Sequence, residues 1–364
     1  MKFICCLILF CVSLNVCSQE DLDAQYSVDG TYFYGTLLRH NKNVTHLVVD
    51  HPTGIILGFN RKTFGEERWE REYNFPDWGV TFAYQDLNND ILGTDYGLYA
   101  HYNFYFLNRN LQLRIAQGIA YTTNPFDLDS NFKNVSYGSR LLSSTLFLLQ
   151  YDKPEIIDRV GLKAGLAFVH HSNGNFRAPN SGTNVLALNL GLQYAVGNRI
   201  EPTRIQEADT SFTEPIRYNF VLRGGVNESD FYNLGQHPFV VASAYADKRI
   251  SYKNVLQFGV DFFYSTFLEK EIAYVSTAFP SSNLTGDEDF KRIGVFVGHE
   301  FRLGNIGLLS QFGYYVYYPY EYGMITYLRA GASYYIDKNW FAAVTLKSHA
   351  ASAEAIEFSI GYRL

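Results

Sequence analysis

Residues 356–364 alternate between apolar side chains and small or polar ones, and this period-two pattern constrains the fold more than any other feature. Isoleucine, phenylalanine, tyrosine and leucine occupy one face of the segment, whereas glutamate, serine, glycine and arginine occupy the other. The same alternation runs through residues 111–121, 256–264 and 293–302. Such alternation is typical of β-strands whose two faces meet different surroundings. The sequence therefore predicts an all-β protein.

Turn-forming residues join neighbouring runs as antiparallel hairpins, for example at Gly304-Asn305 and Asp337-Lys338-Asn339. The runs between Thr31 and Leu364 amount to about sixteen strands, with about twelve as the lower bound. Longer polar stretches alternate with the tight turns, at residues 60–77, 201–215 and 278–289. Long loops at one end and short turns at the other are expected of an antiparallel transmembrane β-barrel.

The N-terminus has the composition of a cleavable signal peptide over residues 1–18. Lys2 gives a positive start, residues 3–16 form an apolar run, and Val16-Cys17-Ser18 offers a cleavage site before Gln19. The apolar run is shorter than the roughly 20 residues of a transmembrane helix. Acylation of Cys17, as in a lipoprotein, is the alternative, although the residues before it are poorly suited.

All four cysteines lie in this leader, so the mature chain has none. Disulfides, thiolate nucleophiles and cysteine-ligated metals are thereby excluded from it. No linker, low-complexity segment or compositional break divides the remainder. We therefore expect a single outer-membrane β-barrel domain over residues 19–364, exported in a Gram-negative cell after removal of residues 1–18.

The charge balance argues against nucleic acid as a partner. Removal of Lys2 leaves 29 of the 30 Lys and Arg residues against 36 acidic ones, a net charge of about −7. Aromatic residues make up 17% of the chain, which is typical of the girdles at the two membrane interfaces of a barrel. A soluble β-sandwich or lipocalin-like barrel is the alternative, because alternation alone does not say which face is inside. The leader, the aromatic content and the lack of disulfides favour the membrane.

One polar group interrupts the apolar faces, in the segment Phe168-Val169-His170-His171-Ser172-Asn173-Gly174. His170 and Ser172 continue the apolar face of the strand in which they lie, and Asn184 opens the leucine-rich face of the next strand. Strand parity therefore predicts that these three residues point outward to lipid from adjoining strands. The same parity directs His171 into the lumen.

These residue types suit nucleophilic catalysis of acyl transfer. A serine two residues from a histidine on one strand face lies within hydrogen-bonding reach of it, as a nucleophile and its general base require. Asn184 would accept a hydrogen bond from the other imidazole nitrogen and fix its tautomer. Asn173 and the backbone N–H of Gly174 are candidates for stabilising an oxyanion. The structural alternative is a group of polar residues at the headgroup boundary. The remaining histidines show no metal-ligand spacing, so we expect neither a metal nor a cofactor.

This segment resembles the lipid A 3-O-deacylases of the PagL type. The resemblance is carried by His170-x-Ser172-Asn173, the Pro179-Asn180 turn and the polar Asn184 twelve positions after the serine. Longer relatives, similar to acyloxyacyl hydrolases, are alike around Asn131–Gly138 and in the closing residues 347–363. The resemblance implies an outer-membrane barrel that hydrolyses an ester-linked acyl chain of lipopolysaccharide. Lipopolysaccharide and the lipid of the outer membrane are then the expected partners.

The chain departs from that pattern in two respects. The small deacylases have eight strands and a glutamate as the third member of the triad, whereas this chain is about twice as long as they need and has Asn184. No acidic residue lies between Asn173 and Arg199. Asn184 can orient His170 but cannot stabilise an imidazolium by charge. A non-enzymatic pore or transport barrel with a vestigial site is therefore the alternative function, followed by an adhesive surface barrel.

Overall fold

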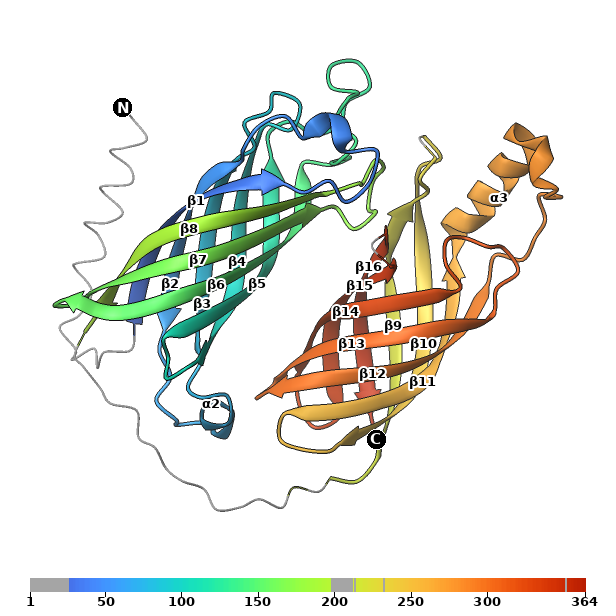
Figure 1. The fold of residues 1–364 in the computed structure, drawn as a ribbon. Coiled ribbons are helices and arrows are strands. Elements are labelled where there is room, and N and C mark those ends of the chain that lie inside the picture. Colours follow the sequence, from blue (N-terminus) through green and yellow to red (C-terminus); the bar gives the residue numbers. More distant parts are fainter. Residues whose placement is uncertain (1–25, 198–211, 213, 232, 351) are drawn as a thin grey trace, which may run out of the picture.

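In the computed structural model, sixteen antiparallel strands of the described residues form two closed barrels that lie side by side (Figure 1). The structure describes residues 26–197, 212, 214–231, 233–350 and 352–364, so the predicted signal peptide lies outside the described residues. The first barrel contains β1 (Tyr26–Leu37), β2 (Thr53–Arg61), β3 (Asp77–Asp86), β4 (Thr94–Phe106), β5 (Leu111–Thr122), β6 (Leu141–Ile157), β7 (Val160–Ser172) and β8 (Thr183–Val196). The second contains β9 (Arg217–Glu228), β10 (Gln236–Arg249), β11 (Asn254–Ser265), β12 (Arg292–Leu303), β13 (Ile306–Tyr317), β14 (Thr326–Tyr335), β15 (Trp340–His349) and β16 (Ser352–Arg363). Short helices lie in the connections, namely η1 (Thr45–Leu47), α2 (Arg68–Glu72), α3 (Thr266–Ala278) and η2 (Pro280–Ser282).

The strand number lies at the upper end of the predicted range, but the strands close as two barrels rather than as the single barrel expected over residues 19–364. Consecutive strands pair throughout each barrel, and β8 returns to β1, with Val196 opposite Tyr26 and Val185 opposite Leu37. β16 likewise returns to β9. Alternation repeats every two residues whatever the number of strands, so the pattern does not indicate where a sheet closes.

Both barrels bury charged side chains inside and expose an apolar outer face, which rejects the soluble alternative. Arg114 and Lys163 of the first barrel are at most 1% exposed, whereas Leu188 and Leu190 on its outer face are 70% and 59% exposed. Inside, Arg114 donates hydrogen bonds to both carboxylate oxygens of Asp29. A soluble barrel would bury the leucines and expose the charges. An apolar belt around a polar lumen is the arrangement of a transmembrane barrel.

Side chains fill the lumen of each barrel. In the second barrel the buried Arg329 pairs with both Asp261 and Glu357, at 2.8 and 2.6 Å. Arg292 pairs with Glu354 in the same lumen, at 2.5 Å. An eight-stranded barrel is just wide enough to hold such side chains, whereas sixteen strands in one ring would enclose a water-filled channel. The two-barrel fold therefore does not form the wide pore of the alternative function.

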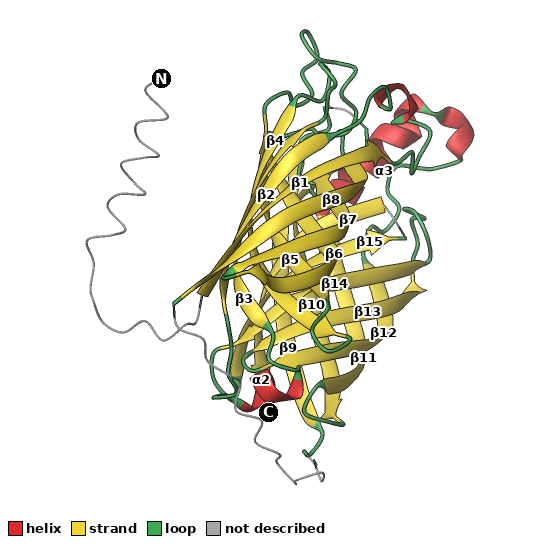
Figure 2. Ribbon diagram, turned by 60° about the vertical axis from the view of Figure 1, so that its left-hand side comes forward, coloured by secondary structure: helices red, strands yellow, loops and turns green. Residues whose placement is uncertain are grey.

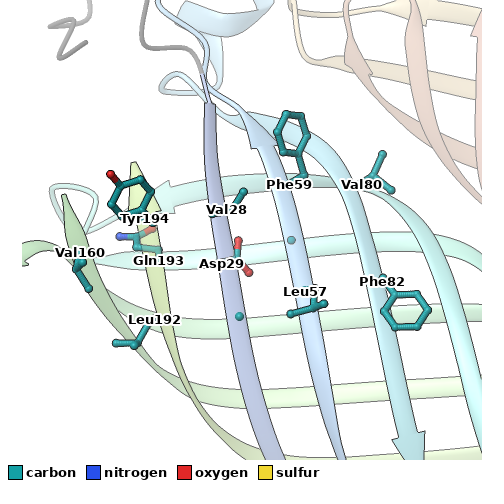
Figure 3. Close-up of a pocket in the computed structure, with 12 residues that line it drawn as sticks. Val28, Asp29, Leu57, Phe59, Val80, Phe82, Val160, Leu192, Gln193 and Tyr194 are labelled. Carbon is teal, nitrogen blue, oxygen red and sulfur yellow. The ribbon is translucent and has the colours of Figure 1, made fainter. Parts of the chain in front are cut away.

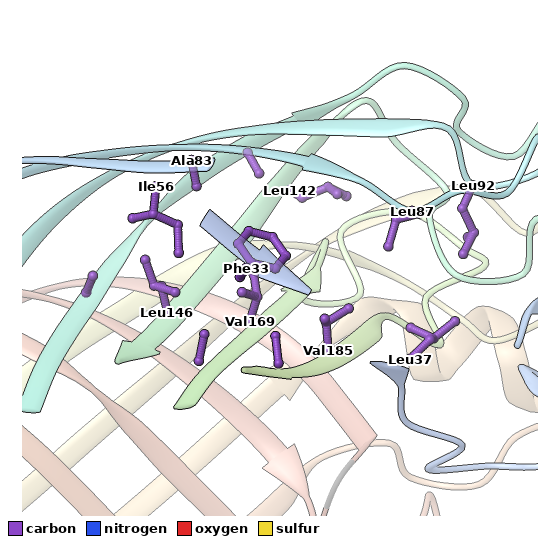
Figure 4. Close-up of a cluster of buried hydrophobic side chains, with 14 of the residues drawn as sticks. Phe33, Leu37, Ile56, Ala83, Leu87, Leu92, Leu142, Leu146, Val169 and Val185 are labelled. Atoms are coloured by element: carbon purple, nitrogen blue, oxygen red, sulfur yellow. The ribbon is translucent and has the colours of Figure 1, made fainter. Parts of the chain in front are cut away.

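An apolar cluster fills the lumen of the first barrel at the end where β7 ends and β8 begins (Figure 4). Phe33, Leu146, Val169 and Val185 are each at most 2% exposed within it. Val169 and Val185 alternate with the outward-facing residues of β7 and β8. Close packing behind these two strands fixes their outer faces, and the candidate site lies on those faces.

The two ends of the barrels carry different connections, and α2 and α3 lie at opposite ends (Figure 2). The expected separation of long loops from short turns holds for residues 278–289 but not for residues 60–77, and most of residues 201–215 lie outside the described residues. The latter connect β2 to β3 at the end of the tight turns. There the guanidinium of Arg68 lies 3.0 Å from the ring centroid of Tyr252 in the second barrel. This connection therefore contacts the neighbouring barrel. No helix among the described residues has the length and apolarity to span a bilayer.

Candidate functional site

The structure brings His170, Ser172 and Asn184 together on the outer face of the first barrel, at the end that carries the longer loops. His170 and Asn184 are directly opposite each other in the β7–β8 ladder. The Nδ1 atom of His170 lies 2.7 Å from Oδ1 of Asn184, and its Nε2 atom lies 3.2 Å from Oγ of Ser172. The imidazole therefore bridges the hydroxyl and the amide, as strand parity predicted.

The partners of His170 determine which of its nitrogens carries the proton. Oδ1 of Asn184 only accepts hydrogen bonds, so Nδ1 of His170 donates. Nε2 then keeps its lone pair and accepts the hydroxyl proton of Ser172. This tautomer is the one in which a histidine can act as general base toward a serine.

The trio is largely buried but remains accessible from the outer face. Ser172 is 6% exposed, whereas His170 and Asn184 are half-buried. The neighbouring His171 points the opposite way, into the lumen, where its Nδ1 lies 3.5 Å from the carboxylate of Asp95. His171 thus belongs to the lumen, as predicted, and takes no part in the outer cluster.

The two oxyanion candidates, Asn173 and Gly174, lie in the loop that follows Ser172 and have different surroundings. The backbone N–H of Asn173 donates to Oδ1 of Asn180, and its side-chain amide donates to the carbonyl of Arg177 at 2.5 Å. Asn173 therefore holds the loop that follows Ser172, with one amide hydrogen left over. Gly174 has a φ of +62° and lies against Ile356 of the second barrel, so a side chain at this position would collide.

The loop at residues 131–138, where the sequence also resembles acyloxyacyl hydrolases, braces the segment that leads into β8. The N–H groups of Ser181 and Gly182 donate to the carbonyls of Val135 and Ser136, both at 3.1 Å. Asn134 in turn caps its own turn by accepting from the N–H of Ser136 at 3.0 Å. These bonds fix the backbone immediately before Asn184.

The second barrel contributes a residue that the sequence analysis missed. Glu228, at the end of β9, accepts a hydrogen bond from the N–H of Ala178 through its carboxylate at 2.9 Å. Its backbone exchanges two more bonds with Asn175, at 3.0 and 2.8 Å. Glu228 is 7% exposed. The loop after Ser172 is therefore bonded to both barrels.

Replacement of Glu228 by alanine is expected to lower turnover at the trio by roughly 10- to 100-fold, because a loop shifted by about 1 Å misplaces its catalytic groups. Glu228→Gln is the matched control, since its amide oxygen still accepts from Ala178 and should keep most of the activity. Turnover rates of the purified variants would be compared in detergent. The folded fraction of each variant would be measured by its heat-modifiable gel mobility. Equal turnover rates for Glu228→Ala and the unaltered chain would contradict the role of the Glu228–Ala178 hydrogen bond.

An apolar hollow lies elsewhere, on the outer face of the first barrel near the start of β1 and the end of β8 (Figure 3). It has a volume of about 640 Å³ and is lined by residues such as Val28, Phe59 and Tyr194. None of the trio lines it. Among the described residues, no three histidine, cysteine or acidic side chains gather as a metal site would require.

The fold and this geometry define a class: a transmembrane-type β-barrel with a serine–histidine constellation on its apolar outer surface. Two family models match the chain. One, described as lipid A 3-O-deacylase (PagL), matches residues 53–193, and the other, described as acyloxyacyl hydrolase, C-terminal domain, matches residues 216–364. The chain therefore belongs to the PagL lipid A 3-O-deacylase family, and it is a carboxylic ester hydrolase.

Porins are among the solved structures that match the chain. A triple mutant of the Rhodopseudomonas blastica porin is 9% identical, with a TM-score of 0.19, and the match covers 93% of this chain and 99% of the porin. A second mutant of that porin is 8% identical over the same shares, with a TM-score of 0.18. At such scores the superpositions carry no argument, and the two-barrel description rests on the strand pairing alone. No protein of curated function matched the sequence.

Proposed function

We propose that this chain removes an ester-linked fatty acyl chain from the lipid A part of lipopolysaccharide, with Ser172 as nucleophile and His170 as general base. One observation carries the proposal: a single imidazole bridges Ser172 and Asn184 on the apolar outer face. An acyl chain of a membrane lipid reaches such a face without leaving the hydrocarbon. The family to which the chain belongs supports lipid A as the substrate.

The proposed reaction begins when Nε2 of His170 takes the hydroxyl proton of Ser172. Oγ of Ser172 attacks the ester carbonyl carbon and forms a tetrahedral oxyanion. His170 then protonates the leaving sugar oxygen, and the C–O bond breaks to leave an acyl-enzyme. Water, deprotonated by His170, attacks the acyl-enzyme and releases the fatty acid and the free serine.

Two groups are proposed as donors to the oxyanion. They are the backbone N–H of Gly174 and the remaining amide hydrogen of Asn173. Donors that are already fixed in place stabilise the developing charge at little reorganisation cost. Two hydrogen bonds supply that fixed geometry: the one from Asn173 to Arg177 within the loop and the one from Ala178 to Glu228.

The location of the site follows from the barrel ends. The trio lies at the end of the longer loops, which face the cell exterior in bacterial barrels, whereas short turns face the periplasm. We therefore place the reaction in the outer leaflet of the outer membrane. Export through the signal peptide at residues 1–18 belongs to this proposal.

The function is tested by making the chain in a Gram-negative cell and weighing its lipid A by mass spectrometry. We expect lipid A species lighter by one ester-linked acyl chain, with the amide-linked chains retained. The freed fatty acid should appear in the membrane extract. Unchanged lipid A masses, in cells whose outer membrane contains the folded chain, would reject lipid A deacylation.

A further inference from the structure

Three polar side chains extend the outward face of the trio onto the next two strands. In the β6–β7 ladder, Ser143 lies opposite Ser172 and Thr145 lies opposite His170. In the β5–β6 ladder, Gln117 lies opposite Thr145. Neighbouring strands are about 4.8 Å apart, so these residues begin about one strand spacing from the trio and end about two spacings away. We name Gln117, Ser143 and Thr145 the polar row.

The polar row is internally bonded but keeps unused hydrogen-bonding capacity. The amide nitrogen of Gln117 donates to Oγ of Ser143 at 3.1 Å, and Oγ1 of Thr145 donates to Oε1 of Gln117 at 2.5 Å. One amide hydrogen and one carbonyl lone pair of Gln117 remain, and so does the hydroxyl hydrogen of Ser143. The row therefore still offers both donors and acceptors.

Apolar residues surround the row on the same outer face. Ile119, Leu141 and Phe147 are 55%, 60% and 37% exposed, and Gln117 itself is exposed. A side-chain amide that faces hydrocarbon has no water with which to complete its hydrogen bonds. A lipid molecule that lies against this face can complete the hydrogen bonds of Gln117.

We propose that the polar row binds the polar linkage region of the substrate, and specifically an amide group beside the scissile ester in an N-acylated sugar. This inference rests on the proposed function and deepens it. The free N–H and the free carbonyl lone pair of Gln117 complement the carbonyl and N–H of a secondary amide. Continuity of the row with Ser172 and His170 places such an amide next to the ester that Ser172 attacks.

The row thus acts as a positioning site. An amide held at Gln117 and a hydroxyl or ester oxygen held at Ser143 orient the acylated sugar across β5 and β6. The scissile carbonyl then lies over β7, where Oγ of Ser172 is located. The site would therefore select lipids in which an amide neighbours the ester over lipids that carry esters alone.

The test measures binding rather than turnover, in protein that carries Ser172→Ala so that cleavage is slow on the timescale of the binding measurement. The probes are a sugar lipid with one ester-linked and one amide-linked acyl chain on neighbouring carbons, and its analogue with an ether in place of the amide. Addition of Gln117→Leu should weaken binding of the amide lipid about tenfold, which is the size expected for one or two hydrogen bonds. Binding of the ether analogue should change less than twofold.

Ile119→Ala is the matched control, because Ile119 lies on the same strand and face and has no polar group. It should affect both probes equally. Equal weakening of both probes by Gln117→Leu, or no weakening of either, would overturn the inference. The outcome is separate from the proposed function: release of fatty acid by the unaltered chain without amide preference would reject only the polar row. Amide preference without any release of fatty acid would reject only the hydrolysis.

Discussion

Replacement of Ser172 by alanine is expected to reduce fatty acid release about 100-fold. In complete serine triads the loss of the nucleophile costs about 10⁶ in turnover, and loss of the carboxylate alone accounts for about 10⁴ of that factor. Because Asn184 occupies the third position, this chain already lacks the contribution of a carboxylate. Loss of Ser172 can therefore remove only the part of the rate enhancement that does not depend on that carboxylate. The rate would be measured on lipopolysaccharide in mixed micelles with purified protein.

The control for this experiment is Ser310→Ala, which removes a hydroxyl from an exposed position in β13 of the second barrel. It should leave the rate unchanged. Release of fatty acid by Ser172→Ala at the rate of the unaltered chain would exclude Ser172 as the nucleophile. The barrel description would stand, since it does not depend on the chemistry of this residue.

Replacement of Asn184 by glutamate is expected to raise turnover at least tenfold, with a ceiling of about 10⁴. The atom Oδ1 of Asn184 lies 2.7 Å from Nδ1 of His170, so the side chain at this position faces the imidazole, and the carboxylate of a glutamate, one methylene longer, is within its reach. A negative charge there stabilises the imidazolium that forms when His170 takes the proton of Ser172. The neutral amide supplies orientation without that charge.

Asn184→Gln separates charge from length, because glutamine has the reach of glutamate without its charge. It should not exceed the rate of the unaltered chain. In protein that also carries Asn184→Glu, Ser172→Ala should cost more than it does alone, since the members of a triad act as a unit. A chain with Asn184→Glu that folds and yet is no faster would show that charge at this position is not what limits the reaction.

Much of this site could be predicted from residue parity alone. The two-residue period of a strand assigns His170 and Ser172 to one face and His171 to the other, and the structure agrees. The hairpin that brings Asn184 opposite His170 follows from the order of the strands. These features depend on neighbouring residues and strands, so the alternation pattern of the sequence is enough to predict them.

The closure of the sheet could not be predicted in the same way. Whether β8 pairs with β1 or with β9 depends on contacts between distant segments, and both pairings satisfy the same alternation. The role of Glu228 escaped notice for a related reason, since its partner Ala178 belongs to the other barrel. Gln117, by contrast, was within reach: it is a polar residue on an outward face between Ile115 and Ile119, and the parity argument used for His170 applies to it equally.

The attachment of the loop after Ser172 to Glu228 has a consequence for how the molecule works in a crowded bilayer. A barrel that borrowed such support from a separate protein would depend on lateral encounters, and its output would vary with surface density. Here Glu228 and the loop that it holds belong to one polypeptide, so the effective concentration of Glu228 at the loop is set by the chain itself. Each copy thus supplies the support of this loop itself.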